Sequence, residues 1–293
     1  MNRGTLCMAV GFVCVLLAGV FFVSPSLAGD ESATQSDVNA TPDNPFRVHT
    51  IRSPYQSGET RVSVLLPRDY DTDRTYRVLY VLPVEAGDGR RWGDGLEEVR
   101  RAALHERFQL ICVAPTFSQL PWYADHPTDK TVWQESYLLK SVIPLVEKQY
   151  STRGDRQGRL LVGFSKSGWG AMTLLLRNPK TFAAAAAWDA PLMMEQFGQY
   201  GSGPIFGTRE NFQRYWPSRL LAQAREPLGV RPRIIHLGYG NFRDHHERFE
   251  RLLNERHFPH RYVDGPVREH AWGSGWLPEA VHSLMEAVEP NAD

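Results

Sequence analysis

The alternation of short buried strands with longer amphipathic helices constrains this chain more than any other feature. Aliphatic runs at Val78–Leu82 and Leu110–Ala114 predict strands, and the apolar spacing within Tyr137–Tyr150 predicts a helix between two of them. The other expected strands are Val62–Leu66, Leu160–Gly163, Phe182–Trp188, Arg233–Leu237 and Arg261–Val263, and the other expected helices are Leu96–Phe108, Gly168–Arg177, His245–Arg256 and Pro278–Val288. This rhythm predicts an α/β fold with a mostly parallel central sheet and helices on both faces. Ligands bind such a sheet beyond the carboxyl ends of its strands.

The first 28 residues are typical of a signal peptide. Arg3 precedes an almost wholly apolar run, Leu6–Val23, and small residues end the segment at Ala28. Cleavage there predicts a secreted or periplasmic protein. The alternative is a retained anchor, because the run approaches the ~18–20 residues that span a membrane. A membrane is expected as a partner only if the leader is retained.

The rest of the chain divides into a spacer and one domain. Residues 29–45 are small and polar without periodicity, which predicts a flexible spacer, and 46–293 form a single domain. Of three cysteines only Cys112 lies beyond the leader, so the mature chain can form no intramolecular disulfide. Acidic and basic residues balance at 33 each, which argues against nucleic acid as a partner and favours small neutral substrates. No cofactor is expected.

The most specific local motif is Gly163-Phe164-Ser165-Lys166-Ser167-Gly168, between an expected strand and an expected helix. A serine on such a tight turn is held above the sheet edge with its hydroxyl exposed, and small neighbours allow the backbones to approach. Ser167 occupies the position where the G-x-S-x-G pattern has its second glycine. The alternative interpretation is an ordinary strand–helix turn with capping serines.

His270 follows the last expected strand and lies downstream of Ser165, as a general base would. An imidazole with a pKa near ~6.5 can accept the serine proton and return it to a leaving group. The helix and its exit carry further histidines that are expected at the surface, whereas His236, in mid-strand, is expected in the core. The histidines expected at the surface are His245, His246, His257 and His260. None of these spacings matches a metal motif, so no metal site is predicted.

Several longer segments carry a family resemblance: TYRVLYVLP, PWYADHP, ESYLLKSVIPLVEKQY and GRLLVGFSKSGWGAMTLLLRNPKTFAAAAA. Over nearly the whole mature chain they resemble the Putative esterase (esterase D-like) family, which includes formylglutathione hydrolases, feruloyl and carbohydrate esterases, and mycolyltransferases. The resemblance implies an α/β-hydrolase fold, a Ser-Asp-His triad and acyl transfer to water. It also places the catalytic histidine at His270, within Arg268-Glu269-His270-Ala271-Trp272.

The triad acid has two main candidates. The family places it in a G-x-x-D pattern after the strand that ends here near Gly238, but Asn241 holds the aspartate position. An asparagine can orient a histidine but cannot balance imidazolium charge. Asp244 is the nearest carboxylate and the first candidate, although it also fits a helix capping box. Asp189, at the end of the strand after the nucleophile helix, is the second, and Asn241 and Asp264 complete the set.

The oxyanion hole requires two backbone N–H groups. One is expected from Lys166, the residue after the nucleophile. The resemblance places the other in an H-G segment, where this chain has Val84-Glu85-Ala86-Gly87, so Glu85 or Ala86 is expected to supply it.

Aromatic residues suggest where a substrate is bound. Trp122 and Tyr123 match the family's W-Y-x-D stretch, and together with Trp272 they are expected to contact the substrate, although an aromatic pair beside a proline also fits simple packing. Residues 191–222 are rich in Gly, Pro and aromatics and are expected to form a cap or lid over the site, or a packed excursion that only covers the sheet.

Together these features predict a secreted serine hydrolase that cleaves small-molecule or carbohydrate-linked carboxylic esters through an acyl-enzyme. Ser167, Asn241 and the missing H-G segment support an alternative, a catalytically silent fold used for binding. A third possibility is transfer of the acyl group to a sugar or lipid alcohol.

Overall fold

The computed structural model describes residues 1, 35–38, 44–223, 228–238 and 240–288. The nine-stranded fold of the described residues belongs to the unit Ser32–Asp293. The predicted signal peptide, apart from Met1, lies outside the described residues. None of the described helices combines the length and the apolar character needed to cross a bilayer.

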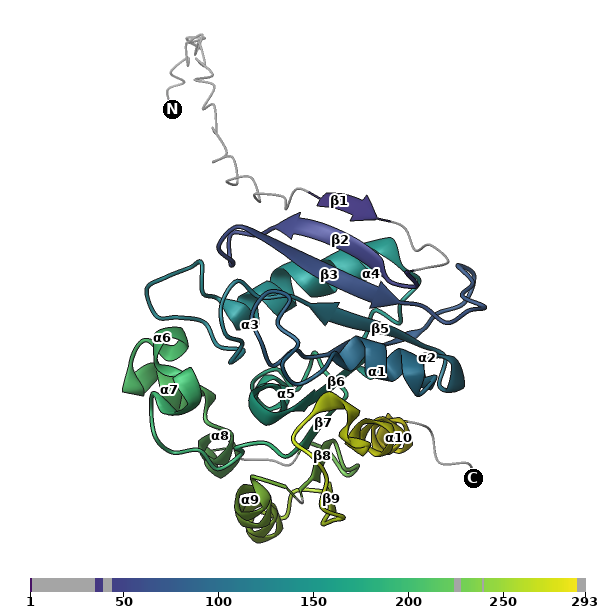
Figure 1. The fold of residues 1–293 in the computed structure, drawn as a ribbon. Coiled ribbons are helices and arrows are strands. Elements are labelled where there is room, and N and C mark those ends of the chain that lie inside the picture. Colours follow the sequence, from purple (N-terminus) through teal and green to yellow (C-terminus); the bar gives the residue numbers. More distant parts are fainter. Residues whose placement is uncertain (2–34, 39–43, 224–227, 239, 289–293) are drawn as a thin grey trace. The chain divides into compact units, whose positions relative to one another are not determined.

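Within the described residues, nine strands form one sheet in the order β1-β2-β3-β5-β4-β6-β7-β8-β9. Their bounds are Gln35–Val38 (β1), Arg47–Arg52 (β2), Glu59–Leu65 (β3), Arg77–Val81 (β4), Leu110–Pro115 (β5), Arg159–Phe164 (β6), Ala184–Trp188 (β7), Ile234–Leu237 (β8) and His260–Val263 (β9). β1, β2, β3 and β5 pair antiparallel in turn, and all pairings from β5 to β9 are parallel. The mostly parallel sheet is therefore confirmed (Figure 1).

The helices lie mainly between successive parallel strands. The α-helices are Gly95–Arg101 (α1), Leu104–Arg107 (α2), Gln134–Tyr137 (α3), Ile143–Gln149 (α4), Ser165–Arg177 (α5), Gly203–Phe206 (α6), Arg209–Tyr215 (α7), Pro217–Gln223 (α8), Arg243–Glu255 (α9) and Trp276–Val288 (α10). Four shorter turns are a π-helix at Leu138–Val142 (η1) and 3-10 turns at Arg156–Gly158 (η2), Gln199–Gly201 (η3) and Trp272–Ser274 (η4).

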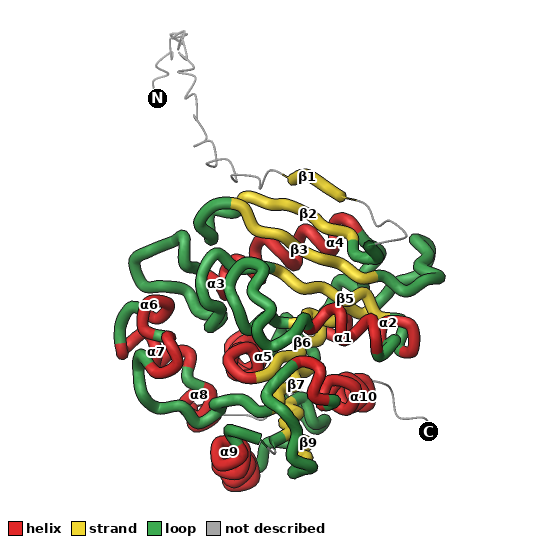
Figure 2. The backbone as a smooth tube through the Cα atoms, viewed as in Figure 1, coloured by secondary structure: helices red, strands yellow, loops and turns green. Residues whose placement is uncertain are grey.

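Both faces of the sheet are covered, because successive strand residues point to opposite sides. Val78 and Tyr80 of β4 pack with residues of α3, α4, α5, α8 and α9, whereas Leu79 and Val81 pack with α1, α2 and α10. Figure 2 shows helices on both sides of the strands. Helices on both faces confirm the doubly covered α/β class that the sequence predicts.

Three expected elements differ from the prediction. The spacer contains strand β1, whose backbone pairs with β2. Leu96–Phe108 is not one helix, since Ala103 has a φ of 51° and separates α1 from α2. Tyr137–Tyr150 belongs to a longer composite in which the π-turn η1 joins α3 to α4. Apolar spacing identifies the buried face in both helical cases but does not detect these local breaks.

Residues 191–222 pack as part of the core. Ile205 and Phe206 of α6 and Phe212 of α7 are almost fully buried. They form a cluster with Trp122 and with Trp169 of α5. Trp169 stacks on Phe212 with ring centroids 6.4 Å apart. The segment thus has a buried cluster of its own, whereas its residue Tyr200 is 46% exposed.

Candidate active site

Ser165 lies where β6 ends and α5 begins, beyond the carboxyl end of a central strand. Its φ of 52° is in the left-handed region, the strained conformation of a nucleophile elbow. The flanking glycines are required by close contacts: a Cβ on Gly163 would lie 2.4 Å from the Ser167 carbonyl oxygen, and one on Gly168 would lie 2.8 Å from Ala190 Cβ. The close backbone approach that requires the second glycine of the G-x-S-x-G pattern therefore occurs at Gly168, one residue after Ser167.

Ser167 has a structural position. Its side chain is fully buried, and its Oγ accepts from the Phe164 N–H at 3.1 Å and donates to the Phe164 carbonyl at 2.9 Å. Both bonds tie the first turn of α5 back to the end of β6. The sequence suggested that a serine here caps the helix. That serine is Ser167, and the hydroxyl of Ser165 does not take part in the cap.

Three side chains from distant segments form one hydrogen-bonded chain. His270 Nε2 lies 3.1 Å from Ser165 Oγ, and His270 Nδ1 lies 2.6 Å from Asp189 Oδ2. The carboxylate must accept from Nδ1–H, which leaves the Nε2 lone pair facing the serine hydroxyl. The arrangement can remove a proton from Ser165 and hold it on the imidazole.

Asp189 is fixed in place by the backbone around it. It directly follows β7, has a φ of 39° and is 1% exposed. Its second oxygen, Oδ1, accepts from the Phe242 N–H at 2.8 Å. A Cβ on Gly240 would lie 2.7 Å from the Asp189 carboxyl carbon. The segment after β8 thus supplies a cradle for the carboxylate instead of the carboxylate itself.

The preference for Asp244 as the acid is therefore corrected. Asp244 is exposed in the first turn of α9, and both ring nitrogens of His270 are taken by other groups. Asn241 is also exposed, and Asp264 is paired with Arg243, with Oδ2 3.0 Å from Nη2. Asp189 reaches His270 because β7, β8 and β9 are neighbouring parallel strands, so the segments that follow β7 and β9 leave the sheet at the same edge.

A second layer of hydrogen bonds supports the residue after Asp189. The Ala190 N–H donates to His246 Nε2 at 2.9 Å, so the His246 proton is on Nδ1, which lies 3.3 Å from His236 Nδ1. His236 then carries its proton on Nε2, 3.2 Å from Glu250 Oε2. Burial lowers the pKa of both histidines, that of His246 well below its usual value. The expected surface position of His246 is wrong, whereas the core position of His236 is confirmed.

One group of metal-ligand type is present among the described residues. His236, Glu250 and His260 each offer one ligand atom, all within 4.8 Å of one another. Their separation in sequence matches no metal motif, so spacing alone could not identify them. Hydrogen bonds join them, since Glu250 Oε2 also lies 2.7 Å from His260 Nε2. A cation there would have to displace the proton that Ala190 and His246 place on His236 Nε2.

The expected oxyanion donors lie on two segments, Lys166 in the first turn of α5 and Glu85 and Ala86 in the loop after β4. The Lys166 N–H is in the first turn of α5, where helix geometry provides no backbone acceptor. The Glu85 carboxylate accepts from the Arg91 N–H at 2.5 Å. Burial lowers the pKa of the Lys166 ammonium and the Arg91 charge lowers it further, while Glu85 acts in the opposite direction. The Glu85 carboxylate is thus held by a backbone N–H and lies close enough to the Lys166 ammonium to affect its pKa.

The three aromatic residues expected to contact substrate are core residues. Trp122 and Tyr123 are 0% exposed and Trp272 is 2% exposed. Tyr123 donates its hydroxyl to the Pro83 carbonyl at 2.6 Å, and Trp122 packs edge-on against Trp169. This packing corrects the substrate-contact prediction for Trp122 and Tyr123, whose side chains offer a ligand no surface, whereas Trp272 lines a pocket beside the segment that follows β4.

Two half-buried aromatics that the sequence did not single out lie beside the imidazole instead. The ring centroid of Trp92 is 5.0 Å from that of His270, and the centroid of Phe242 is 5.9 Å from it. Phe242 in turn contacts Tyr200, which is 46% exposed. Neither Trp92 nor Phe242 lies in a recognisable motif, so only their tertiary position identifies them.

The chain is similar to several known esterases and hydrolases. Esterase MT1326 and Esterase Rv1288 of Mycobacterium tuberculosis are each 29% identical over 147 residues, which cover 46% of this chain but only 30% of each relative. Among solved structures, an S-formylglutathione hydrolase from Agrobacterium tumefaciens aligns with a TM-score of 0.67 and 17% identity over 87% of this chain and 99% of that one. A ferulic acid esterase aligns with a TM-score of 0.65 and 20% identity over 88% and 99%.

The structural matches show the α/β-hydrolase fold. A family profile, described as Putative esterase, matches residues 53–236 of the 293. Because this match covers more than half of the chain and includes the elbow serine and Asp189, the chain belongs to the Putative esterase family.

Proposed function

We propose that this protein hydrolyses carboxylic esters through an acyl-enzyme, with Ser165 as nucleophile, His270 as general base and acid, and Asp189 as the group that orients His270. The observation that carries the proposal is the Asp189–His270–Ser165 hydrogen-bond chain on a strained elbow. A catalytically silent fold would have no need to keep all three groups aligned.

The geometry supports the following sequence of steps. Ser165 Oγ attacks the ester carbonyl carbon while its proton moves to His270 Nε2, and the Lys166 N–H with an N–H of the Glu85–Ala86 loop stabilises the oxyanion. The carbon–alkoxide bond then breaks, and His270 protonates the departing alcohol. Water attacks the acyl-enzyme, gives one proton to His270 and receives the acyl group, and the proton finally returns to Ser165. Asp189 remains a carboxylate throughout.

The substrate class follows from the surroundings of His270. Trp92 and Phe242 are half-buried and Tyr200 is partly exposed beside Phe242, so the accessible surface near the imidazole is aromatic. Such a surface suits an ester with an apolar or aromatic acyl group. We infer a carbohydrate-linked ester of this kind, an inference that rests on the expectation from the sequence that residues 1–28 are a leader and that the protein is exported.

A fluorophosphonate probe tests nucleophile and activity together. The wild type should be labelled at Ser165, as shown by peptide mapping, and should hydrolyse p-nitrophenyl acetate. Ser165→Ala should lose both the label and the hydrolysis, whereas Ser167→Ala should retain both. Labelling at Ser167, or hydrolysis that persists in Ser165→Ala, would refute the proposal.

Two further measurements separate the alternatives. Mass spectrometry of exported protein should find a mature N-terminus after Ala28, and a mature chain that still begins with Met1 would contradict export by cleavage. With a feruloyl ester as donor and glucose present, free acid should be the main product. Predominant formation of the glucose ester would instead indicate acyl transfer.

A further inference from the structure

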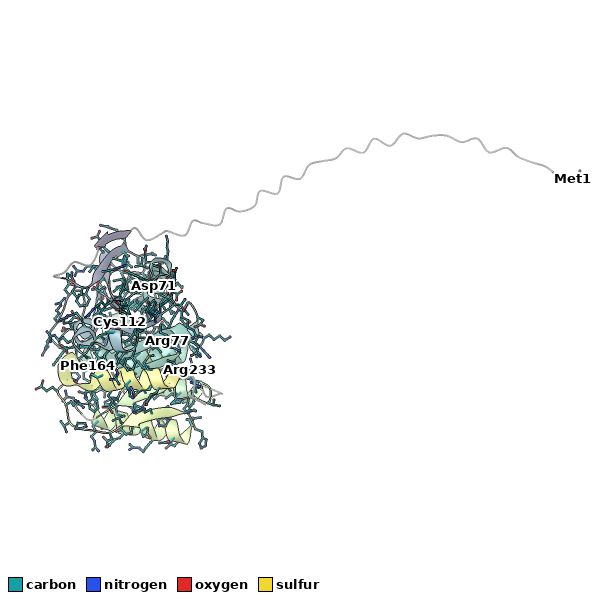
Figure 3. The ribbon with its side chains drawn as sticks, turned by 90° about the vertical axis from the view of Figure 1, so that its right-hand side faces the viewer. Met1, Asp71, Arg77, Cys112, Phe164 and Arg233 are labelled. Carbon is teal, nitrogen blue, oxygen red and sulfur yellow. The ribbon has the colours of Figure 1, made fainter. Side chains whose placement is uncertain are left out.

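A pocket of about 500 Å³ opens at the amino ends of the parallel strands. β6 runs from Arg159 to Phe164 and delivers Ser165 at its far end, so this pocket lies at the opposite edge of the sheet from the nucleophile. Figure 3 labels Arg77, which begins β4, and Arg233, which directly precedes β8, towards one side of the domain, and Phe164, the last residue of β6, on the other side. Five arginines line the pocket: Arg77, Arg153, Arg156, Arg231 and Arg233.

Arg233 places a buried positive charge beneath the pocket. It is 8% exposed, and its nitrogens donate to the carbonyl oxygens of Ala183 and Phe182, both at 2.6 Å, and of Leu228 at 2.7 Å. The Pro179 carbonyl also accepts, at 2.6 Å. Carbonyls satisfy the N–H groups but carry no net charge, and no carboxylate of the described residues forms an ion pair with Arg233. A buried charge without a counterion is costly.

Neighbouring charges increase the positive potential. Burial and the nearby Arg156 guanidinium together lower the pKa of Arg233 to about 10. Arg156 is exposed, and within the described part of the chain it forms no ion pair. The adjacent carboxylate, Asp155, is engaged by Arg153 Nε at 3.0 Å and by the Gly158 N–H at 3.0 Å. The described residues thus place more positive than negative charge around the pocket.

The remaining wall of the pocket is apolar. Leu228 and Val288 line it together with Val230, which is 95% exposed. A fully exposed valine beside a set of guanidinium groups favours a ligand that has both an anionic head and an apolar part. Inorganic ions alone would leave this wall unused.

We propose that this pocket is a second ligand site, which binds a phosphate or sulfate ester through the guanidinium group of Arg156, within the positive charge of the other arginines, while Val230 contacts the organic part of the ligand. Guanidinium groups match the oxygen geometry of phosphate and sulfate through paired N–H donors. Arg233 contributes its charge from below, since its own donors are occupied. The site is separate from Ser165, so its occupation does not depend on the proposed ester hydrolysis.

Calorimetric titration of the full chain with phenyl phosphate and with inorganic phosphate, in chloride buffer of matched ionic strength, tests this site. Phenyl phosphate should bind more tightly than inorganic phosphate. Arg156→Gln should weaken both by about tenfold or more, the size expected for one charge-assisted hydrogen bond. Val230→Ser should remove only the advantage of the phenyl group. The Ser165→Ala protein should bind as the wild type does, which excludes the nucleophile as the site.

The matched control is Arg209→Gln, which removes one exposed charge from α7, far from this edge in Figure 1. It should leave both affinities unchanged. Absence of binding by the wild type, or an equal loss in Arg209→Gln and Arg156→Gln, would overturn the proposal. Co-sedimentation with phosphatidylcholine vesicles, with and without phosphatidic acid, then identifies whether the phosphate ester is a lipid or a soluble molecule. Arg156-dependent binding to the acidic vesicles indicates a lipid headgroup. Binding of phenyl phosphate without binding to these vesicles indicates a soluble ester.

Discussion

Backbone strain is concentrated at two residues of the candidate site. Ser165 and Asp189 both have a positive φ, a conformation that costs of the order of 1–3 kcal/mol for a residue with a side chain. Such conformations persist only where the surroundings determine them. Here the Phe242 N–H and the close approach of Gly240 determine the position of Asp189, while the Ser167 cap determines the turn at Ser165.

The acid can be identified by matched substitutions. Asp189→Asn should lower kcat by something on the order of 10⁴, because an amide cannot hold the productive tautomer of His270 or balance imidazolium charge. Asp244→Asn, on exposed α9, should leave kcat near wild type. Steady-state kinetics on p-nitrophenyl acetate measures both. Equal activity in the two variants would remove Asp189 from the mechanism.

Ser167 should affect stability more than catalysis. Ser167→Gly removes two buried hydrogen bonds and adds a flexible residue to the first turn of α5, so it should lower the free energy of unfolding by about 1–2 kcal/mol. Hydrolysis by the folded protein should persist. Urea unfolding followed by circular dichroism measures the stability change, and a loss of activity without a loss of stability would contradict this role.

At the scale of elements, α5 depends on how closely it approaches the segment after β5. A Cβ on Gly170 would lie 2.1 Å from Cδ2 of the fully buried Tyr123, whose φ of 57° leaves its backbone little freedom to move. Helix α5 can therefore pack this closely against Tyr123 only because residue 170 has no side chain.

Gly170→Ala should accordingly destabilise the protein by about 1–3 kcal/mol or more through overpacking, despite the better helix propensity of alanine. Gly154→Ala provides the control, since a Cβ there meets nothing within 4 Å. Thermal unfolding of both variants tests the contact. A Gly170→Ala protein as stable as the wild type would show that α5 can shift without cost.

For the whole molecule, the buried histidines predict how stability depends on pH. His246 and His236 have folded pKa values below the usual 6.5, so below pH 6.5 the unfolded chain binds protons that the folded chain excludes. Stability therefore falls as the pH drops below 6.5, by up to about 1.4 kcal/mol per pH unit for each such histidine. The folded pKa of Glu250 is lowered to about 2, so the protein loses further stability as the pH falls below the ordinary glutamate pKa of 4.5.

Urea unfolding at intervals between pH 7 and pH 5 measures this slope. His246→Gln should reduce the slope of the free energy of unfolding against pH, because glutamine binds no proton in either the folded or the unfolded chain. The exposed His257→Asn should leave the slope unchanged. An identical slope in wild type and His246→Gln would show that His246 does not remain neutral in the folded protein.

Local sequence determined the α/β class, the elbow at Ser165 and the order of nucleophile and base. These features depend on periodicity and on short-range turn chemistry, both of which are contained in contiguous residues. The same reasoning located β4, β5 and β6 to within a residue or so, because buried parallel strands are continuous apolar runs. Breaks such as the one at Ala103 were not detected, since a single positive φ leaves no periodic signal.

Tertiary structure decided which carboxylate meets His270. Asp189 and Asp244 are both plausible in sequence, and the choice depends on the pairing of β7 with β8, which brings Asp189 and the Phe242 N–H to one edge of the sheet. The same holds for Trp122 and Tyr123, which an aromatic motif suggested as site residues but whose packing buries them. Burial and distance are properties of the assembled layers, and no stretch of contiguous residues contains them.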